Sequence, residues 1–132
     1  RKYPTILTPH DGEFARLGYP ARERQNAAAA AARELGCILV LKGHRTVIAA
    51  PDGRLAVNTT GSDGMAKGGS GDVLTGLLTG LLAQGVEPFA ACCCAVWLHG
   101  RAGDLAAEEK GHRGMTPADM IEKLPYALKE VE

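Results

Sequence analysis

A glycine-rich stretch that ends in an aspartate is the part of the chain best suited to chemistry. Five glycines lie in the eleven residues from Gly61 to Gly71, and Asp72 follows directly. Glycine at this density lets the backbone adopt positive φ and come close to a ligand, and successive N–H groups can then form a concavity that binds anions. The apolar residues from Val73 onward recur at helical spacing. The free N–H groups of a helix start are therefore expected to add to the same anion site.

Asp72 has two interpretations. An aspartate in the first turn of a helix is commonly a capping residue and needs no chemistry. Alternatively, Asp72 is a general base held beside the anion site, and Gly68 and Gly69 favour this because a cap does not need them. The residues alone leave both interpretations open.

A known family shares this stretch. Its sequence, Gly-Ser-Asp-Gly-Met-Ala-Lys-Gly-Gly-Ser-Gly-Asp-Val-Leu-Thr-Gly over residues 61–76, closely resembles the signature of the ATP/ADP-dependent NAD(P)H-hydrate dehydratases. These enzymes belong to the ribokinase-like superfamily, whose Gly-x-Gly-Asp element forms an anion hole with a catalytic Asp. Residues 8–14, Lys42-Gly43 and Asn58 fit the family at the same relative positions. The resemblance covers nearly the whole chain.

The resemblance implies an α/β, ribokinase-like fold, in which a central, mainly parallel sheet is flanked by helices and carries a small β-hairpin. It also implies that residues 1–132 are the C-terminal part of a single NAD(P)H-hydrate dehydratase domain, about half of the full domain. The strand expected over residues 3–8 should then pair with the missing N-terminal half, or with another copy of the chain, because an unpaired strand edge is prone to association.

The resemblance further implies the reaction and its residues. Hydrated NADH or NADPH (NADHX or NADPHX) would lose water at the expense of ATP or ADP, with Mg²⁺ present. Asp72 is the implied catalytic base, His10 and Glu13 are implied substrate contacts together with Asp72, and Glu13 would also assist magnesium indirectly. The residues implied to bind the nucleotide and its phosphates are Lys42, Gly43, His44, Arg45, Thr46, Asn58, Gly68, Gly69, Ser70 and Gly71.

Plainer interpretations of these positions also stand. Glu13 is by itself an ordinary carboxylate at a helix start, and His10 could simply cap a strand end. Lys42 could belong to a basic turn, and Asn58 could satisfy a turn at the end of a strand.

Two other function classes compete with the dehydratase. A ribokinase-like kinase for sugars or vitamin precursors would use the same pocket chemistry and release a stable phosphorylated product. A non-catalytic nucleotide-binding module would need no base, and Asp72 argues against it. The Met65-Ala66-Lys67 segment, and His10 in place of the superfamily's Asn, favour the dehydratase.

Periodicity and turn residues predict the remaining elements. Asp11 is a candidate N-cap for a helix that Gly18 closes, and Pro51-Asp52-Gly53-Arg54 is typical of a hairpin turn. Gly76 and Gly80 are expected to allow close helix packing, His99 to pack in the core, and Asp104 to have no special role. The predicted strands cover residues 3–8, 37–41, 46–50 and 55–58, and the predicted helices cover residues 12–18, 22–35, 71–84, 87–110 and 118–124.

Composition excludes several classes of protein. The 132 residues carry a formal net charge of zero, which argues against nucleic-acid binding, and no apolar run reaches the about 18 residues that a membrane span needs. Arg1-Lys2-Tyr3-Pro4 leads directly into an expected strand, so a signal peptide is not expected here. Cys37 and the consecutive Cys92–Cys94 lack Cys-x-x-Cys spacing and are expected to be small buried hydrophobes, whose free thiols suit the cytoplasm. The expected partners are small molecules and, in a homo-oligomer, further copies of the chain.

Overall fold

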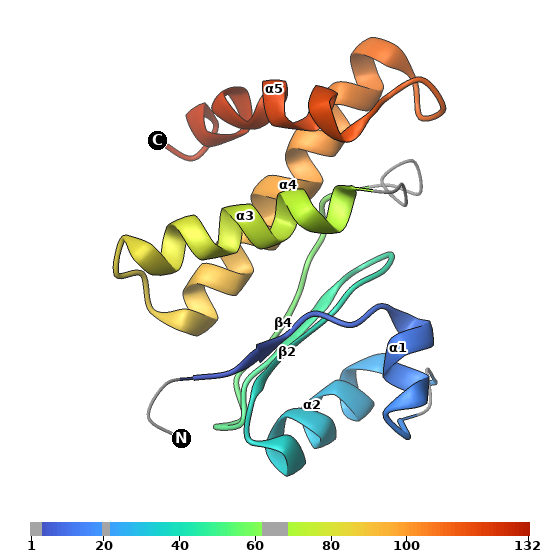
Figure 1. Ribbon diagram of the computed structural model, residues 1–132, viewed down its shortest axis with the longest axis vertical. Coiled ribbons are helices and arrows are strands. Elements are labelled where there is room, and N and C mark those ends of the chain that lie inside the picture. The colour runs from blue at the N-terminus through green and yellow to red at the C-terminus, as the bar shows by residue number, and fades with distance from the viewer. Residues whose placement is uncertain (1–3, 20–21, 62–68) are drawn as a thin grey trace. The chain divides into compact units, whose positions relative to one another are not determined.

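The computed structural model describes residues 4–19, 22–61 and 69–132. These residues fall into two compact units (Figure 1). The first unit comprises residues 1–58 and 87–93 and holds the β-sheet, and the second comprises residues 59–86 and 94–132 and is helical.

The sheet of the first unit has four strands in the order β1 (Ile6–Leu7), β2 (Ile38–Leu41), β3 (Val47–Ala49) and β4 (Leu55–Val57). β1 pairs with β2 in parallel, whereas the β2–β3 and β3–β4 pairs are antiparallel. The α/β class and the Asp52-Gly53 hairpin are confirmed, but the described sheet is mixed rather than mainly parallel. The cause is the short loop of residues 42–46, because a parallel crossover needs a dozen or more residues.

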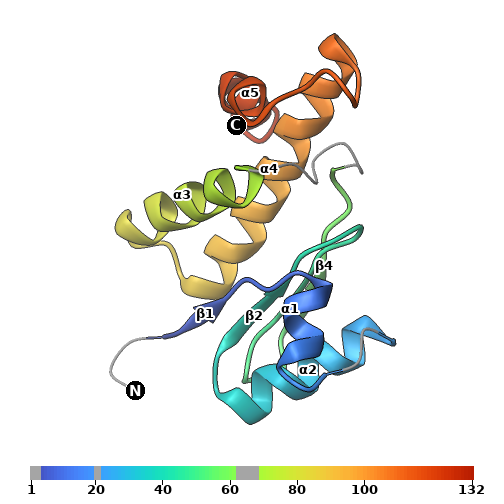
Figure 2. The same cartoon turned by 45° about the vertical axis from the view of Figure 1, so that its right-hand side comes forward.

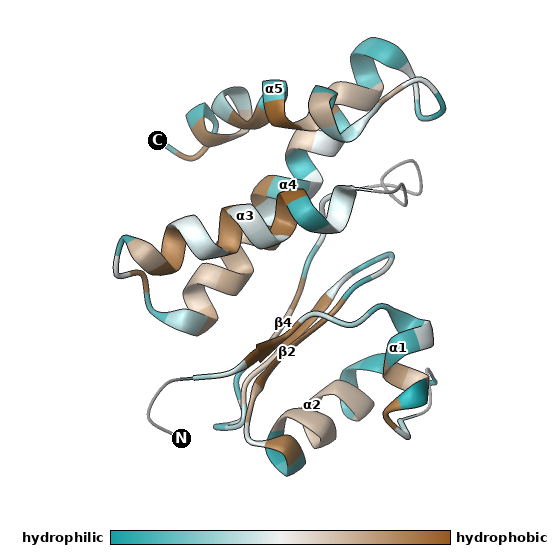
Figure 3. Cartoon of the chain, viewed as in Figure 1, coloured by the Kyte–Doolittle hydropathy of each residue, from teal (hydrophilic) through white to brown (hydrophobic). Residues whose placement is uncertain are grey.

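Two helices, α1 (Asp11–Arg16) and α2 (Arg24–Leu35), cover one face of this sheet (Figure 2). α2 begins two residues later than predicted because Glu23 has a left-handed φ of 50°, and it ends as predicted at Gly36 with φ 62°. The strands are the most apolar part of the unit (Figure 3). The buried residues that form this core are Phe14, Ala28, Ala31, Ala32, Leu39, Leu41, Val47 and Ala49.

The second unit is built from α3 (Ser70–Ala83), the part of α4 (Pro88–Lys110) that begins at Cys94, and α5 (Pro117–Lys129). α5 continues through Pro125 to Lys129, beyond the predicted end at Leu124. Its apolar side continues past the proline, since Leu124 and Ala127 both pack with Leu98 and Ala102. The predicted end of this helix at Leu124 was therefore wrong.

The cysteines are only partly buried. Cys37 and Cys92 are buried, but Cys93 is half-buried and Cys94 is exposed, because three consecutive residues cannot all face the same side of a helix. Burial raises the pKa of the Cys92 thiol to about 12, so that it stays protonated at neutral pH. No three His, Cys, Asp or Glu side chains in the described part of the chain form a group that could hold a metal ion.

The described helices include no candidate membrane span. None of the helices over residues 4–19, 22–61 and 69–132 combines the length and the apolarity that crossing a bilayer requires.

Gly76 and Gly80 do not serve helix packing, contrary to expectation. Both are exposed on α3, and a Cβ atom built on either meets no atom within 4 Å. A helical glycine with nothing against it is less stable than alanine because its backbone loses more conformational entropy on folding.

Replacing Gly80 with alanine should therefore raise the free energy of unfolding by about 0.5–1 kcal/mol, as measured by urea denaturation. Gly36→Ala is the matched control, since a Cβ there also meets nothing within 4 Å but the backbone φ is +62°. That variant should lose about 1–2 kcal/mol through left-handed strain. Equal effects of the two substitutions would contradict the argument.

Candidate active site

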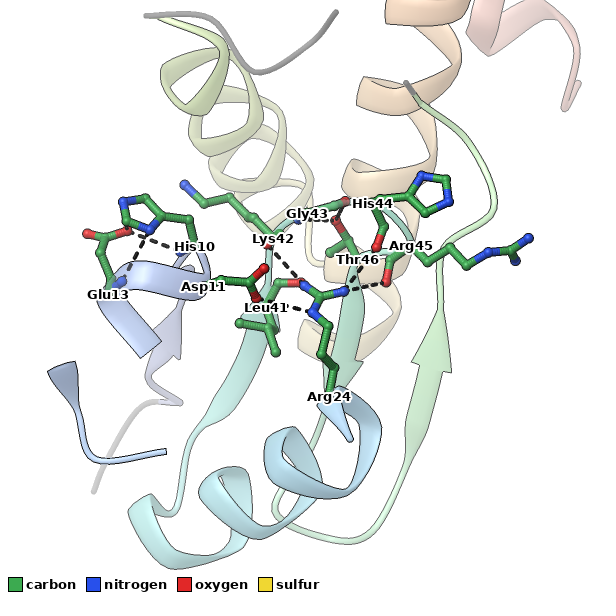
Figure 4. A network of polar contacts seen from close by, with 10 residues as sticks. All are labelled: His10, Asp11, Glu13, Arg24, Leu41, Lys42, Gly43, His44, Arg45 and Thr46. Atoms are coloured by element: carbon green, nitrogen blue, oxygen red, sulfur yellow. Dashed lines mark hydrogen bonds and ion pairs between the residues drawn. The ribbon is translucent and has the colours of Figure 1, made fainter. Parts of the chain in front are cut away.

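One group of candidate site residues, in the first unit, lies where β1 and β2 end. Their parallel pairing aligns Ile6 with Ile38, and the register continues to a bridge between His10 and Lys42. The Lys42 N–H donates to the Pro9 carbonyl at 2.8 Å. The pairing thus brings two of the predicted site residues side by side at the carboxyl edge of the sheet, where open α/β sheets bind ligands (Figure 4).

His10 is the N-cap of α1, and the prediction that Asp11 has this role was wrong. His10 Nδ1 accepts a hydrogen bond from the Glu13 N–H at 3.1 Å, and Glu13 Oε1 accepts one from the His10 N–H at 3.1 Å. Because Nδ1 accepts, Nε2 is the ring nitrogen that carries the hydrogen. Both side chains are about half exposed, at 57% and 48%, so the cap leaves them accessible to a ligand.

The Glu13 carboxylate is held in its ionised form. The hydrogen bond from the His10 backbone is the main cause that lowers the pKa of Glu13, and the positive charge of Lys42 adds to it. An ionised, exposed carboxylate therefore lies beside the edge residue Lys42. This arrangement is suited to hydrogen bonding with a polar substrate or with water on a metal ion.

The loop after β2 folds back on itself. The Thr46 hydroxyl donates to the Gly43 carbonyl at 3.1 Å and accepts from the Gly43 N–H at 3.3 Å. Gly43 adopts φ 154° and Arg45 adopts a left-handed φ of 56°. The Asn58 N–H then donates to the Thr46 carbonyl at 2.8 Å, which ties the end of β4 to the same loop.

Arg24, which sequence reasoning missed, binds this loop from the side of α2. Its side chain is 22% exposed, and its Nε donates to Asp11 Oδ1 at 3.1 Å. The two other guanidinium nitrogens donate, at 3.0 to 3.2 Å, to the carbonyls of Leu41, Lys42, His44 and Arg45. The sequence signal for this role was the position of Arg24 in the first turn of α2, where a cation is unfavourable beside the positive end of the helix dipole. An arginine at such a position is expected to make specific contacts elsewhere.

A hollow of about 490 Å³ opens beside the loop. Val47 and Val57 give it an apolar part, and Asn26, His44 and Arg45 give it a polar rim. This size and mixture are usual for a site that takes a small organic ligand.

A second group of candidate site residues lies at the start of α3, in the helical unit. Gly69 is the N-cap with φ 92°, and no residue of the described ranges caps this helix with its side chain. The first helical hydrogen bond runs from the Val73 N–H to the Gly69 carbonyl at 3.2 Å. The N–H groups of Ser70, Gly71 and Asp72 thus belong to the first turn, where a helix has no partners for them. This is the geometry of an anion site.

Asp72 is exposed in that first turn and does not occupy the cap position, which belongs to Gly69. Its place in the first turn agrees with both interpretations, a first-turn aspartate without chemistry and a general base. Gly68 and the Met65-Ala66-Lys67 segment lie outside the described residues.

The predicted residues thus fall in both units. Asp72, Gly69, Ser70 and Gly71 share the start of α3 in the second unit. The residues that lie together in the first unit are His10, Glu13, Lys42, Gly43, His44, Arg45, Thr46 and Asn58.

The fold places the chain in the ribokinase-like class. It matches a ribokinase-like superfamily protein of Enterococcus faecalis with a TM-score of 0.82 and 35% identity, over 97% of this chain and 45% of the other. The Bacillus subtilis ADP/ATP-dependent NAD(P)H-hydrate dehydratase, co-crystallised with ATP/Mg²⁺ and soaked with CoA, matches with a TM-score of 0.93 and 40% identity, over 98% of this chain and 50% of that one.

The family is narrower than this class. A family model described as NAD(P)H-hydrate dehydratase matches residues 1–126, and the chain belongs to this family. The bifunctional NAD(P)H-hydrate repair enzyme of Moorella thermoacetica is 50% identical over 98% of the chain, and the Bacillus subtilis ADP-dependent (S)-NAD(P)H-hydrate dehydratase is 42% identical over all of it. The chain spans 25% of the length of the first relative and 50% of the second.

Replacing Arg24 with lysine should destabilise the protein by about 1–3 kcal/mol, since an ammonium cannot reproduce a planar fork that serves four carbonyls. Urea denaturation measures the change. Arg33→Lys on the same helix is the control, because Arg33 is exposed and its substitution should stay within about 0.5 kcal/mol of wild type. Similar losses in both variants would show that the carbonyl contacts of Arg24 contribute little.

Proposed function

We propose that the protein removes water from hydrated NADH or NADPH and uses ATP or ADP to drive the step. We also propose that residues 1–132 form the C-terminal part of a single dehydratase domain. Membership of the family supports both proposals. The observation that carries the reaction is the uncapped start of α3, which combines glycine backbone, first-turn N–H groups and the exposed carboxylate of Asp72.

The nucleotide is assigned to the loop of residues 42–46. The Lys42 ammonium would neutralise a phosphate, and Gly43 would let the backbone approach it. The hollow lined by Val47 and Val57 would take the nucleoside. The contacts of Arg24 and Thr46 support this assignment because a loop fixed before binding loses less entropy on binding.

The chemical step is assigned to the start of α3. Asp72 would accept the proton of the hydroxyl group on the hydrated ring. The oxygen of that group would attack the terminal phosphorus of the nucleotide, and the bond from this phosphorus to the rest of the nucleotide would break. The N–H groups of Gly69, Ser70 and Gly71 would stabilise the charge on the transferring phosphoryl group. The lone pair of the ring nitrogen then expels the phosphorylated oxygen as phosphate, and loss of a proton from the neighbouring ring carbon to water restores the dihydronicotinamide.

His10 and Glu13 are assigned to the substrate and, indirectly, to magnesium. Glu13 fits an indirect role, because one ionised carboxylate can hold water on an ion that the nucleotide phosphates coordinate. Magnesium would supply charge neutralisation on those phosphates. His10 Nε2 carries the ring hydrogen and lies 3.4 Å from Glu13 Oε1, so His10 and Glu13 would orient a substrate oxygen together.

The experiment is a direct assay of a protein that spans the whole domain length of the relatives. With ATP or ADP and hydrated NADH, the absorbance of the reduced ring should return as the nucleotide is hydrolysed. A phosphorylated sugar without recovery of the ring would identify a kinase, and nucleotide binding without either product would identify a non-catalytic module.

The location of the protein and the pairing of its first strand are further proposals. Free thiols favour a cytoplasmic location. β1 pairs on one side with β2 and has no second strand partner among the described residues, which supports pairing with the other half of the domain or with a second copy.

Asp72→Asn should lower turnover by about 10²–10⁴-fold, the usual contribution of a general base. The amide keeps the shape of the side chain but cannot take the proton, so the affinity for nucleotide and the melting temperature should stay near wild type. Steady-state kinetics, calorimetric titration and thermal melting measure the three quantities. A sharp fall in melting temperature with unchanged turnover per folded molecule would make Asp72 a purely structural residue.

Gly69→Ala should weaken nucleotide binding by roughly tenfold or more, the effect of losing one well-placed hydrogen bond. Gly69 has φ +92°, and its new Cβ would lie 3.3 Å from Pro117 Cγ, so the start of α3 must shift. Gly53→Ala is the matched control, because Gly53 has φ +100° with nothing within 4 Å. Both variants should lose stability, but only Gly69→Ala should lose affinity in calorimetric titration.

A further inference from the structure

One stretch of α4, residues 97–104, contacts both ends of the glycine-rich segment. At the entry, the Thr60 hydroxyl donates to the Trp97 carbonyl at 2.9 Å, and the Gly61 N–H donates to Asp104 Oδ2 at 3.0 Å. At the exit, His99 Nε2 lies 2.9 Å from the Ser70 carbonyl oxygen and 3.1 Å from its hydroxyl. All these residues belong to the helical unit.

The expectations for His99 and Asp104 were therefore wrong. His99 is half-buried and hydrogen-bonded to the start of α3, rather than packed as an apolar core residue. Asp104 accepts a hydrogen bond from the backbone at the entry to the glycine-rich segment, so it has a specific partner. Neither contact could be read from helical spacing, because both partners are backbone groups distant in sequence.

Gly100 lets the two elements come this close. A Cβ atom on Gly100 would lie 2.1 Å from the Thr60 hydroxyl oxygen and 2.8 Å from the Thr60 carbonyl carbon. Any side chain at this position would push the entry of the segment away from α4.

The contact of His99 controls an N–H group through the geometry of the peptide. A carbonyl oxygen only accepts, so Nε2 must carry the hydrogen that is directed at the Ser70 oxygen. The Ser70 carbonyl and the Gly71 N–H belong to one planar peptide unit and point in opposite directions. Holding the Ser70 oxygen therefore fixes the direction of the Gly71 N–H in the first turn of α3. Because Nε2 is the donor, the Ser70 hydroxyl can only accept from it, and the hydroxyl hydrogen is not part of the contact with His99.

We propose that His99 and Asp104 are positioning residues that fix the two ends of the glycine-rich segment and so preorganise the anion site at the start of α3. Neither side chain touches the substrate. They act through the orientation of backbone N–H groups, which stabilise developing charge only when they already point at it. The catalytic part of this inference rests on the proposed dehydratase function.

The test compares two substitutions of His99 in a protein that spans the whole domain. His99→Gln keeps an N–H donor about as far from the backbone as Nε2, whereas His99→Phe keeps the ring and loses the donor. His99→Phe should lower kcat by about 10–100-fold with little change in KM, since misaimed donors act mainly on the transition state. His99→Gln should restore most of kcat. Equal kcat values per folded molecule for wild type and His99→Phe would overturn the proposal.

Amide hydrogen exchange over residues 69–73 gives a readout that does not depend on the reaction. Exchange should be faster in His99→Phe than in His99→Gln and wild type, and unchanged exchange would overturn the positioning role. If wild type itself does not restore NADH, the proposed function fails, while the exchange result still decides whether His99 orients the helix start.

Asp104 supplies a second pair of variants in case His99→Phe does not fold. Asp104→Asn retains an oxygen that can accept from the Gly61 N–H, whereas Asp104→Leu does not. Asp104→Leu should lower kcat and speed exchange at the start of α3, and Asp104→Asn should behave like wild type. Loss of stability alone in Asp104→Leu, with kcat per folded molecule unchanged, would show that Asp104 is structural only.

Discussion

Two parallel strands finish at the same edge of a sheet, and the alignment of Ile6 with Ile38 therefore decides where His10 and Lys42 lie. A shift of this pairing by one residue would exchange the faces of β1 and separate the two ends. The bond from the Lys42 N–H to the Pro9 carbonyl extends the register past the strands. The capped helix α1 and the loop after β2 both begin from this fixed point, so the candidate residues of the first unit depend on it.

The loop after β2 presents a second physical problem, because it turns several carbonyls toward one place. Carbonyl groups that converge repel one another and need donors. Arg24 meets this need with a guanidinium whose charge is delocalised and whose donors lie in one plane. Asp11 balances the charge of Arg24 at 3.1 Å. The carbonyls are therefore satisfied from the side of α2, while the side chains of His44 and Arg45 stay exposed.

Sequence patterns predicted helices and turns that depend on local spacing. The apolar period located α3 and α4, glycine marked the end of α2, and Asp52-Gly53 located the hairpin. The patterns missed contacts between residues far apart in the chain, such as those of Arg24 and His99, because no spacing encodes them. The N-cap of α1 was misassigned for a different reason. Histidine is an uncommon cap, and the neighbouring aspartate has the higher statistical preference.

The helix starts differ in their caps: α2 and α3 have a left-handed N-cap residue without a side-chain hydrogen bond, whereas α1 and α5 are capped. α1 and α5 both have a complete capping box, from His10 with Glu13 and from Thr116 with Asp119. α3 begins with Gly69, which has no side chain to cap it. A missing cap typically costs about 1 kcal/mol of stability, and the left-handed φ of Gly69 excludes the usual capping residues from that position. The first-turn N–H groups, which no side chain of the described residues caps, are retained at a cost to the fold, and the contacts from His99 and Asp104 limit the motion that such a helix start would otherwise have. A helix start without a cap is less stable, and contacts from a neighbouring helix restore part of that stability. This pattern is expected where backbone N–H groups must remain open to a ligand.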